Sequence, residues 1–115
     1  MEISTIKLTS LNLEIWRQNF KRREMSTFTL DGAVFLLEEL GNGWRLPNIL
    51  ELTIMNNLMS IDIFATESSS EEDYWSSETD PDNAMFCNMS FSFSDEEVYS
   101  REHKEYLKVR PVRTI

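Results

Sequence analysis

The sequence at residues 41–52, Gly-Asn-Gly-Trp-Arg-Leu-Pro-Asn-Ile-Leu-Glu-Leu, constrains the fold more than any other part of the chain. Its glycines favour the end of a helix, because the residue after the last helical turn often adopts a left-handed conformation. A Trp-Arg-Leu-Pro bend follows. Asn48 and Glu51 then have the spacing of a capping box at the start of a second helix. We therefore expect two helices joined by a short, bent connection.

The periodicity of apolar residues supports both helices. The first is predicted over residues 30–40, with Thr29 as its N-cap, Asp31 in its first turn and Gly41 after its last turn. Its predicted inward face consists of Leu30, Ala33, Val34, Leu37 and Leu40. The second helix starts after Pro47, and we interpret its methionines as core filling rather than an adaptable binding groove. Its predicted inward face consists of Leu52, Met55, Leu58 and Met59.

Alternation of apolar and polar residues predicts short strands on both sides of the helices. These strands are expected at 3–8, 11–16, 74–77, 85–93, 98–101 and 107–113, and the Ser- and Glu-rich segment 66–73 is expected to be a loop. In segment 85–93 we expect one buried face, with Met85 and Cys87 pointing inward. Helices followed by antiparallel strands indicate one α+β domain over residues 1–115.

Charge is distributed unevenly along the chain. Residues 1–50 contain six acids and six bases, residues 51–100 contain twelve acids and no Lys, Arg or His, and residues 101–115 contain five bases and two acids. A base-free segment repels phosphate, so we expect no direct binding of nucleic acid. An alternative interpretation of the acidic bias is a solvated surface that keeps the protein soluble.

The inventory of reactive side chains argues against an enzyme. His103 is the only histidine and Cys87 the only cysteine, which is too few for a zinc site or for a nucleophile and base in an evident motif. The sequence therefore predicts no catalytic residue, no cofactor and no metal ligand. A lone cysteine, no export segment and no apolar run of about 18 residues favour a cytoplasmic protein without membrane contact.

Four short motifs occur in a fixed order: Trp-Arg-Leu-Pro at 44–47, Glu-Leu at 51–52, Tyr-Trp-Ser-Ser at 74–77 and Val-Arg-Pro-Val-Arg at 109–113. Together they resemble the Lcl C-terminal family of bacterial C-type-lectin-like domains, distant relatives of formylglycine-generating enzymes. The resemblance spans about residues 11–113 and implies a C-type-lectin-like fold with two helices packed on a twisted antiparallel sheet. Asn48 stands where the family usually has Thr, and Pro111 indicates that the last strand is at an edge or bulged.

The resemblance also limits the chemistry to be expected. The formylglycine-generating relatives use two active-site cysteines, and this chain has only Cys87, so their oxidase chemistry does not carry over. Sugar-binding C-type lectins use a Glu-Pro-Asn or Gln-Pro-Asp loop and a Trp-Asn-Asp strand. Asp-Pro-Asp-Asn at 80–83 is a partial match to the loop, so a carbohydrate-binding lectin, calcium-assisted, is the alternative function. Arg45, Arg110 and Arg113 are interpreted as scaffold residues rather than an anion site.

The expected function is a non-catalytic module that recognises another protein through acidic loops at 67–73, 78–83 and 94–97. One specific form of this hypothesis is an inhibitor, of a phage or mobile-element type, that occupies the basic groove of a nucleic-acid-handling enzyme. The candidate partner-binding residues are carboxylates with two tyrosines as aromatic anchors: Glu71, Glu72, Asp73, Tyr74, Glu78, Asp80, Asp82, Asp95, Glu96, Glu97 and Tyr99.

Overall fold

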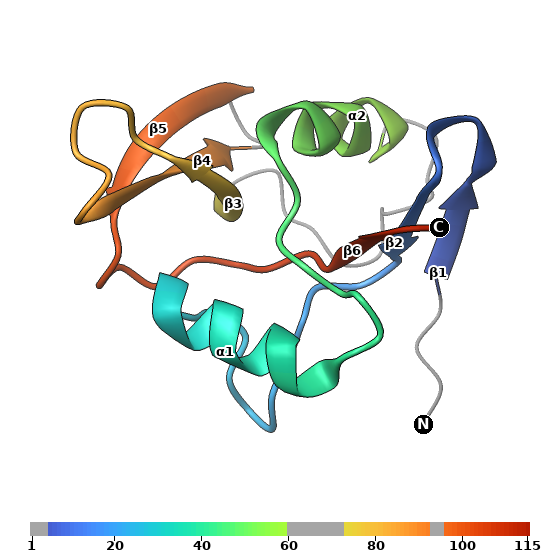
Figure 1. The fold of residues 1–115 in the computed structure, drawn as a ribbon, viewed down its shortest axis with the longest axis horizontal. Coiled ribbons are helices and arrows are strands. Elements are labelled where there is room, and N and C mark those ends of the chain that lie inside the picture. The colour runs from blue at the N-terminus through green and yellow to red at the C-terminus, as the bar shows by residue number, and fades with distance from the viewer. Residues whose placement is uncertain (1–4, 60–72, 93–95) are drawn as a thin grey trace.

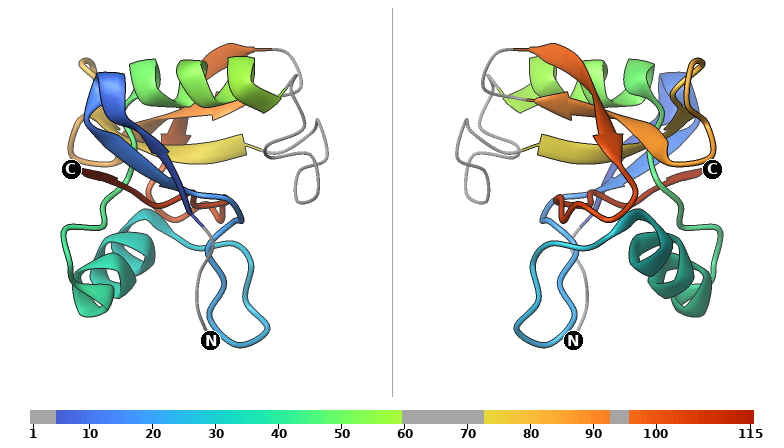
Figure 2. Two further views of the ribbon diagram at one scale, coloured as in Figure 1. Left: turned by 90° about the vertical axis from the view of Figure 1, so that its right-hand side faces the viewer. Right: turned by 90° about the vertical axis from the view of Figure 1, so that its left-hand side faces the viewer.

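The computed structural model describes residues 5–59, 73–92 and 96–115. In these residues the chain forms two α-helices and two three-stranded antiparallel sheets, so the predicted α+β class is confirmed (Figure 1). The helices lie on opposite sides of the molecule, with the strands between them (Figure 2). Neither of the helices in this part of the chain is long and apolar enough to cross a membrane.

The first sheet joins the beginning and the end of the chain. Its strands are β1 (Thr5–Leu8), β2 (Leu13–Trp16) and β6 (Val112–Thr114), in the order β1-β2-β6. The predicted strand 11–16 starts two residues late, because Thr9–Leu11 forms a 3-10 turn that ends in a left-handed Asn12. The predicted strand 107–113 is shorter than expected, because the regular strand β6 begins only after Pro111. As Pro111 indicated, β6 lies at the edge of the sheet.

The second sheet consists of β3 (Asp73–Thr79), β4 (Cys87–Ser92) and β5 (Glu97–Glu102), with β4 at its centre. The outer edge of β3 is covered by other parts of the chain, since Trp75 N donates to Lys108 O at 3.0 Å and Ser77 N donates to Pro47 O at 2.8 Å. β5 forms the opposite edge, and most of its residues are exposed.

Helix α1 (Leu30–Leu40) has the predicted bounds. Thr29 Oγ1 accepts a hydrogen bond from Gly32 N at 3.2 Å, and Gly41 ends the helix with φ of 73°. The predicted inward face was too wide, because Val34 is 40% exposed and Leu40 38% exposed. Val34 instead lines an open pocket, so the helix buries a narrower stripe against the strands.

Helix α2 (Ile49–Met59) starts with the predicted capping box. Glu51 N donates to Asn48 Oδ1 at 2.7 Å, and Asn48 N donates to Glu51 Oε1 at 2.9 Å. Leu52 and Met55 are buried as predicted. Leu58 and Met59 belong to the helix, but their side chains are not among those that the structure describes, so the prediction that they face inward is not tested.

Two apolar clusters fill the interior, one on each side of β3. Because side chains alternate along a strand, Tyr74 and its neighbour Trp75 point to opposite faces and belong to different clusters. The first cluster lies under α2 and consists of Leu13, Ile15, Leu52, Met55, Tyr74, Phe91 and Val112. The second lies under α1 and consists of Trp16, Phe20, Phe28, Leu30, Ala33, Leu37, Leu46, Trp75 and Val109.

The prediction that segment 85–93 buries a single face was wrong. Asn88, Ser90 and Ser92 are buried although they alternate with the apolar residues Cys87 and Phe91. β4 is the central strand of a sheet that is covered on both faces, so its polar side chains are enclosed as well. They are hydrogen-bonded; for example, Asn88 Nδ2 donates to Ser76 O at 3.1 Å.

Candidate functional site

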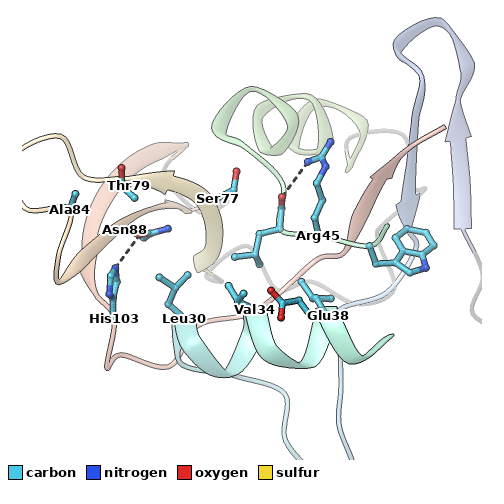
Figure 3. Close-up of a pocket in the computed structure, with 12 residues that line it drawn as sticks. Leu30, Val34, Glu38, Arg45, Ser77, Thr79, Ala84, Asn88 and His103 are labelled. Carbon is cyan, nitrogen blue, oxygen red and sulfur yellow. Dashed lines mark hydrogen bonds between the residues drawn. The ribbon is translucent and has the colours of Figure 1, made fainter. Parts of the chain in front are cut away.

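A pocket of about 440 Å³ lies between α1 and the sheet that contains β3 and β4 (Figure 3). Four separate parts of the chain line it: α1, the connection to α2, the β3–β4 hairpin and the turn after β5. The lining residues are Leu30, Val34, Leu37 and Glu38 of α1, Trp44, Arg45 and Leu46 of the connection, and Ser77, Thr79, Ala84, Asn88 and His103. Sequence patterns could not reveal this pocket, because no single segment carries it.

One end of the pocket is polar. His103 Nε2 lies 3.1 Å from Asn88 Oδ1 (Figure 3). The backbone N–H of His103 donates to Phe86 O at 2.7 Å. The imidazole therefore contacts an amide rather than a carboxylate of the kind that orients a catalytic base. Cys87 is buried, and its Sγ lies 3.6 Å from Asn83 Nδ2.

Arg45 extends from the pocket wall towards α2. Its Nη1 and Nη2 donate to Glu51 Oε1 and Oε2 at 2.8 and 2.9 Å, a bidentate pair. The hydrogen bond with Glu51 raises the pKa of Arg45. Burial alone would raise the pKa of Glu51, but hydrogen bonds from Arg45 and from Asn48 N hold it below its ordinary value. This guanidinium therefore stabilises the start of α2.

The other two motif arginines also bind the scaffold. Arg110 is buried; its Nη2 donates to Asn19 Oδ1 at 2.7 Å and its Nη1 donates to Trp16 O at 3.1 Å. Arg113 Nε donates to Glu14 Oε1 at 2.7 Å. A hydrogen bond from Thr5, followed by that from Arg113, keeps the pKa of Glu14 below its ordinary value despite burial. The prediction that these arginines bind carbonyls and carboxylates of the fold is confirmed.

The sequence-predicted partner residues occupy different environments. Glu71, Glu72 and Asp95 lie outside the described residues. The prediction that Tyr74 anchors a partner was wrong, because its side chain is fully buried in the first cluster. Its hydroxyl donates to Asn19 Oδ1 at 2.6 Å, inside the protein.

Two of the predicted carboxylates bind structural partners. Asp73 forms an ion pair with Arg101, which connects β3 to β5 across the sheet. Glu78 Oε2 accepts a hydrogen bond from Ile49 N at 2.6 Å and so caps the first turn of α2. Glu78 also lies within β3 rather than in a loop. Both carboxylates therefore make contacts that stabilise the fold.

Asp80 joins the β3–β4 turn to β5. Its Oδ2 accepts from Ser100 Oγ at 2.5 Å and its Oδ1 accepts from Asp82 N at 2.8 Å. These hydrogen bonds, that of Ser100 first, lower the pKa of Asp80. Asp82 itself is exposed in the same turn. The Asp-Pro-Asp-Asn sequence thus forms a tight turn, as its composition predicts.

Glu96, Glu97 and Tyr99 are exposed. Glu96 Oε1 accepts from Asn56 Nδ2 of α2 at 2.8 Å. Strand register places Glu97 and Tyr99 on the face of the sheet that carries Asp73, whereas Ser100, which binds Asp80, points to the other face. The described carboxylates therefore form two groups around β5 rather than one continuous patch.

Two functional candidates were missed by sequence reasoning. Met85 is 81% exposed and Phe86 is 61% exposed, although Met85 was predicted to point into the core. Residues 83–86 form a turn, with Phe86 N donating to Asn83 O at 3.1 Å, so the strand begins only at Cys87. The turn-forming residues at 80–83 are the sequence signal that could have indicated a turn extending through residue 86, with the strand starting later than residue 85.

No group of three or more His, Cys, Asp or Glu side chains that could hold a metal ion occurs within 5–59, 73–92 and 96–115. No protein-family model matches this chain, and no curated protein matches it at a significant level. The resemblance to C-type-lectin-like domains stays a prediction.

Proposed function

We propose that this protein is a non-catalytic binding module that recognises a basic surface of a protein partner. The binding surface, here called the acidic face, consists of two groups of residues around β5: the β3–β4 turn at 80–86, and the exposed residues Glu96, Glu97 and Tyr99. One observation carries the proposal: the turn exposes Met85 and Phe86 a few residues from the carboxylates of Asp80 and Asp82. Large apolar side chains surrounded by charge are typical of sites for protein partners.

The charge distribution supports a basic partner. Residues 46–100 contain no Lys, Arg or His, so no base within that segment competes for its carboxylates. Glu96 and Glu97 add exposed negative charge at the start of β5, and Tyr99 adds an exposed aromatic ring on the same strand. Such a surface is complementary to lysines and arginines that hold phosphates, which suits an inhibitor of a nucleic-acid-handling enzyme, of a phage or mobile-element type.

A non-catalytic role agrees with the geometry of the reactive side chains. His103 contacts an amide, and Cys87 is buried among the strands. The proposal also includes a C-type-lectin-like fold. It is supported by a sheet that joins the first and last strands, and by two helices that precede a second antiparallel sheet.

Zero-length cross-linking with a carbodiimide tests the proposal, because it couples carboxylates directly to lysine amines of a bound protein. We expect cross-links from a cell lysate to map to Asp82, Glu96 or Glu97. For the partner identified in this way, the triple variant Asp82→Lys, Glu96→Lys and Glu97→Lys should weaken binding by about tenfold or more and reduce its salt dependence. The matched control is Glu39→Lys, a single reversal on α1, far from β5 in sequence.

Unchanged affinity and an unchanged salt dependence in the triple variant would contradict the proposal. Cross-links that map only to carboxylates outside 78–102 would contradict it as well. Circular dichroism of each variant controls for folding, since all three residues are exposed and their reversal should leave the spectrum unchanged.

A further inference from the structure

We infer that the pocket beneath α1 is an anchor site for one apolar side chain of the partner, flanked there by lysine or arginine. This inference rests on the proposed protein-binding function and specifies the chemistry that one part of the surface recognises. The occupant is a basic segment of the partner protein that places an aromatic or branched aliphatic side chain inside the pocket.

The pocket walls suit an apolar side chain. Leu30 and Leu37 form the floor from α1, and Trp44 and Leu46 contribute from the connection to α2. The volume of about 440 Å³ lies within the range of about 300–1,000 Å³ typical of sites that enclose organic groups. An aromatic or branched side chain that enters this space leaves water and contacts hydrocarbon, which is favourable.

The apolar surface continues beyond the mouth of the pocket. Val34 lines the pocket and is 40% exposed. Met85 and Phe86 directly follow Ala84, another lining residue, and Phe86 is held beside His103 by the hydrogen bond between its carbonyl and the His103 N–H. A surface that extends past the pocket can contact the residues on either side of an anchor, so it favours a protein segment over an isolated small molecule.

The charges near the pocket select a basic segment. Glu38 lines the pocket from the exposed side of α1, and the turn that carries Asp80 and Asp82 adjoins the lining residues Thr79 and Ala84 (Figure 3). The positive charge of Arg45 is directed away, towards Glu51. The carboxylate of Glu38 in the pocket lining and the exposed carboxylate of Asp82 in the adjoining turn are therefore complementary to lysine or arginine next to the anchoring side chain.

Three short peptides test the inference on the isolated protein. Isotope-labelled protein is titrated with acetyl-Lys-Phe-Lys-amide while the methyl and indole signals are followed by NMR. We expect shifts at Val34, Leu37 and Trp44, three residues that line the pocket. Two control peptides should each bind at least about fivefold more weakly than acetyl-Lys-Phe-Lys-amide. Acetyl-Lys-Ala-Lys-amide lacks the anchoring side chain, and acetyl-Glu-Phe-Glu-amide reverses the flanking charge.

Matched variants on α1 separate the pocket from its surroundings. Glu38→Lys should weaken acetyl-Lys-Phe-Lys-amide by about fivefold. Glu39→Lys makes the same charge change one residue away and should weaken it by less than about twofold, because Glu39 does not line the pocket and its contact with Arg22 is an exposed one at 4.0 Å. Val34→Arg should block the pocket mouth, whereas Phe35→Arg, also on the exposed side of α1, should not.

The outcomes separate this inference from the proposed function. Absent shifts at the pocket, or shifts that survive Glu38→Lys and Val34→Arg unchanged, would overturn the inference, while cross-links at Asp82 would still support the acidic face. Indole that binds as tightly as the basic peptide would also overturn it, since the pocket would then accept an uncharged small molecule. Pocket binding without any cross-linked partner would support the peptide site and count against the acidic face.

Discussion

Arg110 lies where three distant parts of the chain meet. Its guanidinium donates to Asn19 Oδ1 and to Trp16 O, and the Tyr74 hydroxyl donates to the same Asn19 oxygen. The ring of Tyr74 also lies 6.0 Å from the guanidinium carbon. A buried planar fork with several donors thus connects the loop after β2, strand β3 and the segment before β6.

We predict that Arg110→Met lowers the free energy of unfolding by about 3 kcal/mol, because it leaves the Trp16 carbonyl and one Asn19 lone pair buried without this donor. Urea unfolding followed by fluorescence measures the change. Arg113→Met is the comparison, since Arg113 is partly exposed and its loss should cost less. Equal losses in the two variants would show that burial does not decide the contribution of these arginines.

At the scale of elements, the start of α2 depends on two carboxylates. Glu51 accepts from Asn48 N and from Arg45, and Glu78 accepts from Ile49 N. The first of these bonds joins residues three positions apart, and the last joins residues 29 positions apart. The helix end is therefore capped both by its own sequence and by strand β3.

The lowered pKa of Glu51 makes this cap sensitive to acid. The unfolded state binds a proton at the ordinary value of 4.5, and the folded state binds it only at lower pH, so stability is present above 4.5 and is lost as the pH falls through the folded pKa. We predict that Glu51→Gln lowers the free energy of unfolding at neutral pH by about 1 kcal/mol, a modest figure because Arg45 is partly exposed. Urea unfolding from neutral to strongly acid pH should show the two proteins converging. If the difference in the free energy of unfolding between the two proteins does not change with pH, ionisation of Glu51 is excluded as its cause.

Sequence alone predicted the elements that are fixed locally. The bounds of α1 follow from Thr29 and Gly41, and the start of α2 follows from Asn48 and Glu51, because these signals act over one helical turn. Burial was harder to predict. The exposure of Val34 and the enclosure of Ser90 depend on what packs against them from elsewhere in the chain.

The same distinction applies to the candidate site. The acidic residues were found from composition, but not their contacts: Asp73 binds a residue 28 positions away, and Glu78 binds one 29 positions away. Tyr74 was misassigned because strand alternation gives two faces without saying which face is covered. The pocket required four segments to be placed in space, so no local pattern could predict it.

At the scale of the whole molecule, β3 joins the two apolar clusters. Tyr74 belongs to the cluster under α2 and Trp75 to the cluster under α1, and Trp75 Nε1 donates to Phe28 O at 2.7 Å. Displacement of β3 from one cluster would therefore disturb the packing of the other cluster as well. This arrangement favours a single cooperative unit.

We predict one unfolding transition in urea, with the same midpoint in both clusters. The Met55 methyl signal in NMR reports on the first cluster, and tryptophan fluorescence reports on the second, which contains Trp16 and Trp75. Midpoints that differ beyond experimental error would show that the two clusters unfold independently.

The C-terminal segment has a consequence for biosynthesis. Val112 exchanges backbone hydrogen bonds with Arg45, β6 pairs with β2, and Lys108 covers the edge of β3. While the ribosome still holds these residues, the nascent chain has a two-stranded first sheet and an uncovered edge at Trp75. Such an edge can pair with other chains, so the nascent polypeptide is open to misassociation until residues 108–114 have left the ribosome.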